Sequence, residues 1–242
     1  MDIKRKPMGE YQTNCYIITV DNKDFIIDPG VDAIEWIKQN VTNPVVILNT
    51  HGHFDHVWSN NEVSREFGLK IYCPKDDAFM LEKDPYGFGM TPSHPDVLVN
   101  EDEEFDFDGT IVKYHFFPGH TPGCSAIEIN GNLFSGDFIF KGTIGRVDFP
   151  FSSPQNMKES IKKVLSWEKD LKVDKANKEL LEKELKVLDY EQHVLLWNLT
   201  RWHLAKPSER KEKKLKNLAL QLNESGIEKH AALARITDML QS

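Results

Sequence analysis

Short runs of β-branched and aromatic residues alternate with segments of helical periodicity from Tyr11 to about Val173, and Gly and Pro separate them. The predicted strands are 16–20, 25–27, 44–49, 70–73, 110–117, 125–130 and 133–135, and the predicted helices are 32–40, 60–67, 75–82 and 156–167. The Gly- and Pro-rich stretch 84–95 follows neither period and is interpreted as a loop that could close over a substrate.

The pattern changes after Val173, where Lys, Glu and Leu dominate. In this part of the sequence Gly226 is the only glycine and Pro207 the only proline. Residues 1–173 hold 17 Lys and Arg against 27 Asp and Glu, a net charge of −10, whereas the remainder holds 13 against 11, a net of +2. One apolar stripe at helical spacing comprises Leu181, Leu185, Leu188, Gln192, Leu195, Leu199 and Trp202. We therefore expect a domain over 1–173 and a separate all-helical segment over 174–242.

Composition indicates a soluble globular protein. The 242 residues are 40% hydrophobic and 28% charged, and no apolar run approaches the roughly 20 residues that span a membrane. A net charge of −8 disfavours phosphate backbones, and no apolar run follows Lys4, Arg5 and Lys6 as in a secretory signal. We expect a cytoplasmic protein with no nucleic-acid or membrane partner. Its three widely spaced cysteines are expected to be reduced and buried.

Candidate chemistry is concentrated in 50–56, Thr-His-Gly-His-Phe-Asp-His, directly after the predicted strand 44–49. Two imidazoles two residues apart, His51 and His53, can converge on one cation, and Asp55 and His56 can turn toward a second. Imidazole and carboxylate suit Zn²⁺, Fe²⁺ or Mn²⁺ without deciding among them. The segment therefore predicts a metal site.

Two later positions extend this prediction. His120 lies in a glycine-bounded turn after a strand, which would hold its imidazole rigidly at the edge of a sheet. Asp137 follows the predicted strand 133–135, where a carboxylate could bridge two cations. Either residue alone would more often be a turn residue, but together with the first cluster both are candidate ligands.

The segments 50–56, 118–123 and 136–137 resemble the ordered motifs of the metallo-β-lactamase superfamily over roughly residues 8–173. The chain is most similar to its glyoxalase II-like hydrolases, because 142–150 resembles the Gly- and Arg-containing segment that follows the bridging Asp in that group. The resemblance implies a fold of mixed α/β (α+β) class. Two sheets would lie between outer helices in a four-layer αββα sandwich, with the metals at one edge. The helical C-terminal segment would be appended to it.

The resemblance also implies ligand roles. His51, His53 and His120 would bind the first metal, Asp55 and His56 the second, and Asp137 would bridge them. The family's last ligand, a histidine in a Pro-Gly-His-Gly motif, should fall just after Val173, but the chain reads Asp-Lys-Ala-Asn-Lys there. His193, His203 and His230 could replace it in space, although each lies in a helical pattern. The first site is therefore complete on these grounds and the second conditional.

The leading functional hypothesis is hydrolysis of a thioester such as hydroxyacylglutathione by hydroxide formed from water held at one or two Zn²⁺ ions. Asp55 would orient that hydroxide, and Arg146 would clamp a substrate carboxylate, unless it forms a structural salt bridge instead. Two alternatives stay open: a persulfide dioxygenase with one iron, and a non-catalytic metal-binding scaffold with a helical interaction tail. The leucine stripe could also join copies of the chain into a homo-oligomer.

Overall fold

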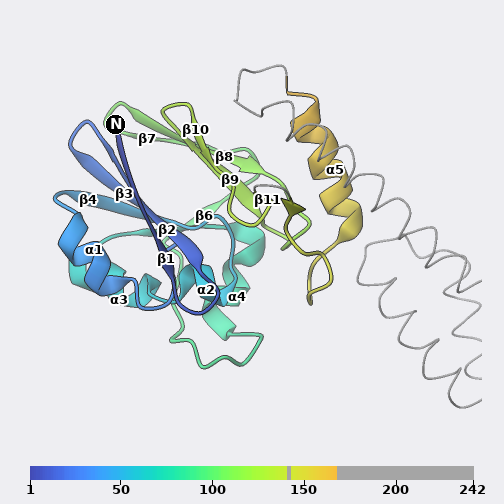
Figure 1. Ribbon diagram of the computed structural model, residues 1–242, viewed down its shortest axis with the longest axis horizontal. Helices are drawn as coiled ribbons and strands as arrows, with labels where there is room; N and C mark the ends of the chain where they lie inside the picture. The colour runs from blue at the N-terminus through green and yellow to red at the C-terminus, as the bar shows by residue number, and fades with distance from the viewer. Residues whose placement is uncertain (141–142, 168–242) are drawn as a thin grey trace, which may run out of the picture.

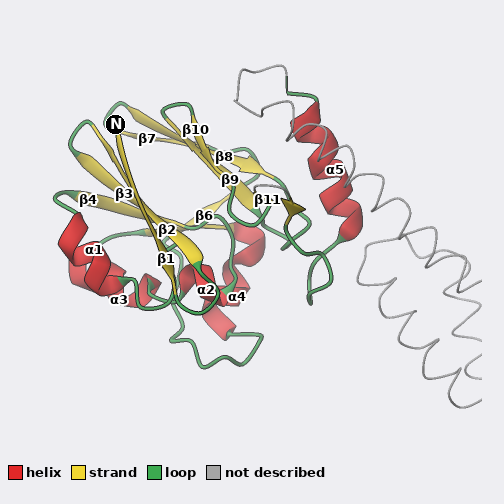
Figure 2. Cartoon of the chain, viewed as in Figure 1, coloured by secondary structure: helices red, strands yellow, loops and turns green. Residues whose placement is uncertain are grey.

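Two β-sheets pack face to face between outer layers of helices in the computed structural model, which describes residues 1–140 and 143–167 (Figure 1 and Figure 2). The αββα sandwich expected from the resemblance is therefore confirmed. The helical segment predicted over 174–242 lies outside the described residues and stays a prediction.

The first sheet has six strands in the order β1-β2-β3-β4-β5-β6. They are β1 (Asp2–Met8), β2 (Thr13–Val20), β3 (Lys23–Ile27), β4 (Pro44–Leu48), β5 (Ile71–Pro74) and β6 (Val97–Val99). The first three pair antiparallel, whereas β3, β4, β5 and β6 pair parallel. The carboxyl ends of these parallel strands therefore lie at one edge, which is where ligand sites of open parallel sheets form.

The second sheet is antiparallel in the order β10-β9-β8-β7. Its strands are β7 (Glu104–Phe107), β8 (Thr110–Phe116), β9 (Ser125–Ile129) and β10 (Asn132–Phe134), and a small hairpin of β11 (Ile139–Phe140) and β12 (Thr143–Ile144) follows. The helices are α1 (Ile34–Asn40), α2 (Phe54–Val57), α3 (Asn60–Phe67), α4 (Ala78–Lys83), preceded by a 3₁₀ turn η1 (Lys75–Asp77), and α5 (Pro154–Leu165).

The apolar side chains form three layers that follow from the strand pattern. The central layer lies between the sheets and includes Phe25, Leu48, Tyr114 and Ile127. A second layer packs α1 and α3 on the outer face of the first sheet, and a third packs α5 on the outer face of the second. Strand β4 contributes to two layers because it is buried on both faces, which explains its nearly continuous apolar sequence.

Local signals set the helix boundaries. Helix α3 ends at Phe67 and is capped by Gly68, which adopts the left-handed conformation with φ of 67°. Helix α5 begins after Ser153, whose side chain accepts a hydrogen bond from the amide of Asn156. The prediction of one helix over 75–82 is corrected by the structure, in which the 3₁₀ turn η1 is followed by helix α4. Strand β1 was not predicted, because as an edge strand it exposes Arg5 and most of its other residues.

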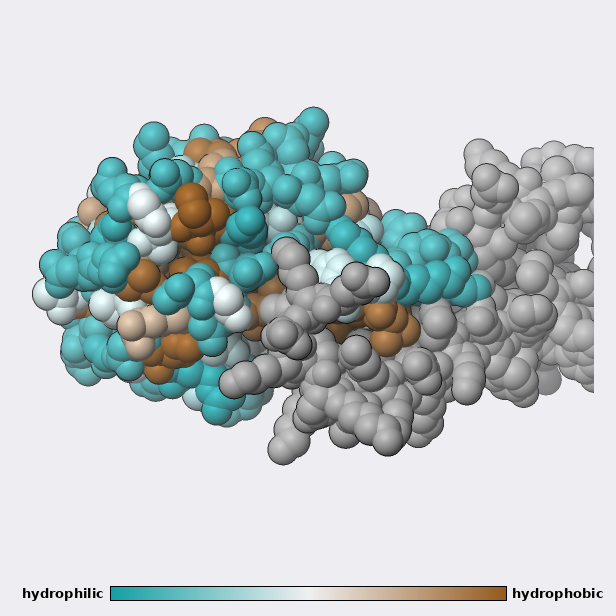
Figure 3. Space-filling view, turned by 90° about the horizontal axis from the view of Figure 1, so that it is seen from above, coloured by the Kyte–Doolittle hydropathy of each residue, from teal (hydrophilic) through white to brown (hydrophobic). Residues whose placement is uncertain are grey.

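The face of the molecule drawn in Figure 3 carries mostly hydrophilic residues in the described part of the chain. Its apolar side chains form small separate patches. Among the described residues, no helix is long and apolar enough to cross a membrane.

Candidate metal centre

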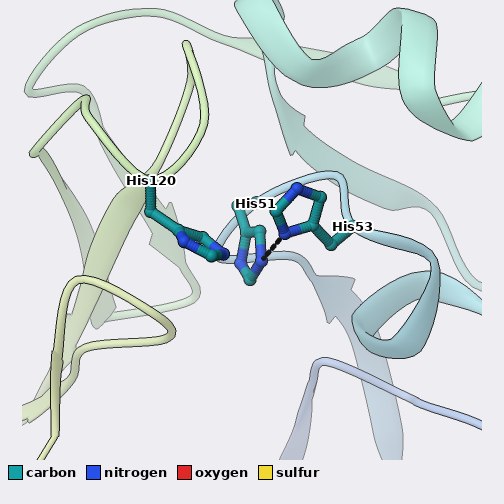
Figure 4. Close-up of side chains that lie close together, drawn as sticks. All are labelled: His51, His53 and His120. Carbon is teal, nitrogen blue, oxygen red and sulfur yellow. Dashed lines mark hydrogen bonds between the residues drawn. The ribbon is translucent and has the colours of Figure 1, made fainter. Parts of the chain in front are cut away.

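Three histidines from two separate loops lie together at one edge of the sheets. His51 and His53 follow β4, and His120 lies in the turn between β8 and β9. Figure 4 shows their imidazole rings close together, with Nε2 of His51 3.2 Å from Nδ1 of His53. One ring nitrogen of each lies within 4.8 Å of the others. The structure thus brings together the three histidines predicted to share a first metal.

Two glycines allow the loops to approach. A Cβ on Gly119, whose φ is 146°, would lie 2.5 Å from the backbone nitrogen of Met157 in α5. A Cβ on Gly136, with φ of 49°, would overlap the side chain of Thr50. Because neither position tolerates a side chain, glycine is required beside both His120 and Asp137.

Hydrogen bonds to the outer ring nitrogens fix which nitrogen of each histidine faces the cluster. The hydroxyl of Thr50 donates its only hydrogen to Oδ2 of Asp28, at 2.6 Å, so its 3.1 Å contact with Nδ1 of His51 must be donated by the imidazole. The Nε2 lone pair of His51 is then left for a ligand.

The same reasoning applies to His120. Its Nδ1 donates to the backbone carbonyl of Arg146 at 2.7 Å. Its Nε2 is buried and has no hydrogen-bond partner among the described residues, although it lies 3.3 Å from Oδ2 of Asp137. A buried nitrogen with an unused lone pair is costly unless something binds it. This orphaned atom shows that the donor set fits a cation.

Burial keeps these histidines neutral. Burial first, and then the neighbouring histidines, lower the pKa of His51 well below the ordinary value and that of His53 to about 3. Burial also lowers the pKa of His120, although Asp137 partly opposes this. Neutral imidazoles at pH 7 are the form that binds zinc and related divalent metals.

A second group of ligand-type side chains adjoins the first. Nε2 of His56 lies 3.1 Å from Oδ1 of Asp137 and 3.6 Å from Oδ2 of Asp55. Donor atoms of His51, His56 and Asp137 also lie within 4.8 Å of one another. Asp137 thus directs one carboxylate oxygen toward each group, the position expected of a bridging ligand.

Charge distinguishes the second group. Burial would lower the pKa of His56, but Asp137, Asp55 and Asp28 raise it well above the ordinary value. Burial would raise the pKa of Asp137, but His56 and other histidines lower it to about 2. Carboxylates that stabilise a proton on an imidazole would also stabilise a divalent cation. The position just after Val173, where the family's last ligand is expected, lies outside the described residues, as do His193, His203 and His230.

Asp55 is carried by α2 rather than by a loop. The one-turn helix begins at Phe54, directly after His53. The hydroxyl of Thr13, at the start of β2, donates to Oδ2 of Asp55. This hydrogen bond fixes the carboxylate beside the second group.

Asp28 is a site residue to which no role was assigned from the sequence. It follows β3 and accepts hydrogen bonds from the amide and hydroxyl of Thr50, at 2.8 and 2.6 Å, and from Nδ1 of His56, at 2.9 Å. It therefore supports both groups. A carboxylate directly after a buried strand parallel to β4 was the signal that could have identified it.

Asp77 joins the two histidine loops and was also missed. This fully buried carboxylate accepts hydrogen bonds from the amide of Gly52 at 2.9 Å, the hydroxyl of Thr121 at 2.6 Å and the amide of Gly123 at 2.6 Å. Burial raises its pKa to about 6, although these hydrogen bonds oppose the rise. Its position in a predicted helix gave no signal of this role.

Arg146 lies at the same site but is engaged within the chain. Its guanidinium forks onto Asp148, with N–O distances of 2.9 and 2.7 Å, and lies 4.3 Å from the ring centre of Phe149. Both charged side chains are 65% exposed. The structure contains the intramolecular salt bridge that was the alternative to a carboxylate clamp, and the clamp stays a prediction.

A pocket of about 840 Å³ covers both groups. It is lined by His53, Asp55, His56, His120 and Asp137, by the arginines Arg5 and Arg146, and by aromatic residues that include Tyr11, Tyr16, Phe54, Tyr86, Phe88, Phe134, Phe140 and Phe149. Apolar walls with a few convergent polar groups are typical of small-molecule sites. The segment 84–95, predicted to be a loop, contributes Tyr86 and Phe88 to the lining.

An αββα sandwich with imidazoles and carboxylates gathered at one sheet edge defines a class of metal-binding hydrolases. The chain belongs to the metallo-beta-lactamase superfamily, whose family model matches residues 8–176. The predicted family is therefore confirmed. This fold binds divalent metals, and the cluster of His51, His53 and His120 fits such a site.

Individual relatives agree with this assignment. The chain is 36% identical over 176 residues to hydroxyacylglutathione hydrolase GloC of Haemophilus influenzae, covering 67% of this chain and 83% of that protein. Among solved structures, the BLEG-1 B3 metallo-beta-lactamase has a TM-score of 0.62 and 30% identity, covering 68% and 86%. TTHA1623 in a di-iron-bound form has a TM-score of 0.58 and 27% identity, covering 67% and 86%. The predicted similarity to glyoxalase II-like hydrolases is confirmed.

Proposed function

We propose that this chain is a metal-dependent hydrolase of glutathione thioesters, with hydroxyacylglutathione as the first substrate to test. The observation that carries the proposal is the convergence of ring nitrogens from three buried, neutral histidines beside a small-molecule pocket. The 36% identity to a hydroxyacylglutathione hydrolase supports the substrate class.

In this proposal His51, His53 and His120 hold the first cation, and Asp137 adds a carboxylate between the two groups. A divalent cation held there lowers the pKa of a bound water toward neutrality and polarises a carbonyl oxygen. The protein supplies the fixed geometry, because the outer nitrogens of His51 and His120 are already hydrogen-bonded to Thr50 and to the backbone of Arg146.

Asp55 orients the attacking water and receives its proton. Its carboxylate lines the pocket beside the second group, and the hydroxyl of Thr13 holds one of its oxygens in place. A carboxylate fixed by a neighbour loses little entropy when it aligns a water. The leaving thiolate would depart on the side of His56 and Asp137.

Two arginines suit a substrate with carboxylate ends. Arg146 already makes the two-pronged contact with Asp148 that a substrate carboxylate would need, so binding there would exchange one carboxylate for another. Arg5 lies on β1 and lines the same pocket. Glutathione carries two carboxylates, which fits the two positively charged side chains of Arg5 and Arg146.

A second cation at Asp55, His56 and Asp137 is part of the proposal. It is supported by the short distances among these side chains and by the two irons of the 27% identical TTHA1623. Zinc, iron and manganese all accept this mixture of imidazole and carboxylate.

The test is thioester hydrolysis by the purified full chain, loaded in turn with Zn²⁺, Fe²⁺ or Mn²⁺ and followed by release of free thiol. The expected result is turnover that a chelator abolishes and added metal restores. The absence of metal-dependent turnover with any of the three ions would overturn the proposal.

Oxygen uptake in a parallel assay distinguishes the hydrolase from the alternative function, a persulfide dioxygenase with one iron. That function is favoured by the absence of the family's last histidine from its expected place after Val173. Oxygen consumption with glutathione persulfide, without thioester turnover, would replace the hydrolase by a dioxygenase. Metal binding without either reaction would indicate a scaffold.

A further inference from the structure

Tyr86 reaches from the loop between α4 and β6 to the outer nitrogen of His53. Its hydroxyl oxygen lies 3.1 Å from Nε2 of His53 and 3.3 Å from the backbone oxygen of Pro150. The tyrosine and imidazole rings meet edge to face, with centroids 5.5 Å apart. No sequence pattern marked Tyr86 as part of the metal centre.

The direction of these two hydrogen bonds determines the protonation of His53. A tyrosine hydroxyl has one hydrogen, and the carbonyl of Pro150 can only accept, so Tyr86 donates to Pro150. The contact with His53 must then be donated by Nε2–H of the imidazole. Nδ1 of His53 is left unprotonated, and this nitrogen is the one that faces His51, as Figure 4 shows.

His53 differs from the other two histidines in how it is held. The outer nitrogens of His51 and His120 contact Thr50, the residue beside His51, and the backbone of Arg146. The outer nitrogen of His53 instead depends on one side chain from a loop more than thirty residues away in sequence.

That loop is internally braced. The carboxylate of Asp84 accepts hydrogen bonds from the amides of Phe88, Gly89 and Met90, at 3.2, 2.8 and 3.3 Å. Met90 is buried in the core beside the first sheet, and the ring of Phe88 stacks on Phe54 with centroids 4.0 Å apart. Tyr86 is therefore presented by a loop anchored on both sides of it.

We propose that Tyr86 is a positioning residue of the first metal site, which holds His53 in the tautomer that presents Nδ1 to the cation. The proposal rests on the metal site of the proposed function but not on its substrate. Outer hydrogen bonds to metal-binding histidines raise metal affinity by about 10- to 100-fold.

The test compares Tyr86→Phe with Tyr11→Phe in the full chain. Both changes remove only a hydroxyl from a pocket-lining tyrosine, and that of Tyr11 has no hydrogen bond among the described residues. The first readout is the His53 tautomer in the metal-free protein, observed by ¹⁵N NMR of the imidazoles. We expect the Nε2–H form in the wild type and in Tyr11→Phe, and a mixture of tautomers in Tyr86→Phe.

The second readout is Zn²⁺ affinity measured by competition with a chelator. We expect a loss of about tenfold in Tyr86→Phe and none in Tyr11→Phe. An unchanged tautomer together with unchanged affinity in Tyr86→Phe would overturn the proposal. If the wild type binds none of Zn²⁺, Fe²⁺ and Mn²⁺, the proposed function fails, and the tautomer readout in the metal-free protein still decides whether Tyr86 orients His53.

Discussion

The two ligand groups at the sheet edge differ in charge and in how many of their expected ligands lie among the described residues. The first consists of three neutral histidines whose outer nitrogens are each hydrogen-bonded, to Thr50, Tyr86 and the backbone of Arg146. The second combines one histidine of raised pKa with carboxylates. A cation can enter the first group without displacing a proton, whereas in the second it would replace the proton on His56.

The difference indicates a division of labour. A tripod of fixed, neutral nitrogens is suited to retaining a cation, because its geometry and protonation are set in advance. A carboxylate-rich group is suited to orienting water and accepting protons. We therefore infer that the first group dominates metal affinity and the second dominates the reaction.

The largest expected effect follows from removing the proposed water-orienting carboxylate. Asp55→Ala should reduce thioester turnover by roughly 10²- to 10⁴-fold while leaving the tightest Zn²⁺ affinity unchanged. Turnover and chelator competition measure the two quantities separately, with Asp76→Ala as the exposed control. Full turnover in Asp55→Ala would remove this residue from the reaction.

Removing one histidine from each group breaks the comparison directly. His51→Ala should weaken the tightest Zn²⁺ binding by more than about 100-fold, because it deletes a ligand rather than an outer partner. His56→Ala should leave that binding nearly unchanged. The exposed His94, altered to Ala, is the matched control. Equal losses in the two variants would mean that the groups do not bind independently.

Asp77 tests whether the histidine loops depend on a shared anchor. Asp77→Asn replaces a carboxylate that accepts three hydrogen bonds by a carboxamide. The NH₂ group of the carboxamide can only donate, so it would face at least one of the three donors without forming a hydrogen bond to it. The free energy of unfolding should fall by about 1–3 kcal/mol. The neighbouring Asp76→Asn, on an exposed residue, should change it by less than about 0.5 kcal/mol. Denaturant titration decides, and equal effects would contradict the anchor.

Asp24, a carboxylate remote from both ligand groups, allows the effect of acid on folding stability to be measured separately from its effect on metal binding. Burial would raise the pKa of Asp24, but hydrogen bonds from Thr19 and from the amides of Thr42 and Asn43 lower it overall. A pKa lower in the folded than in the unfolded state gives stability above the unfolded value, lost as pH falls through the folded one.

We therefore expect Asp24→Asn to cost about 1–2 kcal/mol of unfolding free energy at pH 7 and progressively less below about pH 4. Asp21→Asn in the adjacent turn is the control, because its side chain is exposed and Asn tolerates its left-handed conformation. A cost for Asp24→Asn that does not change with pH would show that these hydrogen bonds do not depend on the charge.

The sequence predicted those members of the candidate site that share one segment or follow a strand end, and the structure brings them together. His51, His53, Asp55 and His56 share one segment after a buried strand, and strand-end geometry brings His120 to the same edge. Thr13, Asp28, Asp77 and Tyr86 were not assigned roles, because each acts through contacts with residues distant in sequence. A single polar residue in a loop or helix carries no periodic signal of such a contact.

The fold shows the same limit. Strands β2, β3, β4, β8 and β9 were predicted because they bury an apolar face or two. Strands β6 and β7 are short and partly exposed, and their pairing with β5 and β8 defines them more than their composition does. Tertiary pairing of this kind overrides local propensity.

X-ray absorption of the protein loaded with one equivalent of Zn²⁺ tests the central claim most directly. The account predicts three imidazole nitrogens at about 2.0–2.1 Å in the wild type and the loss of one in His120→Ala. A zinc shell dominated by carboxylate oxygens, or one that His120→Ala leaves unchanged, would contradict it.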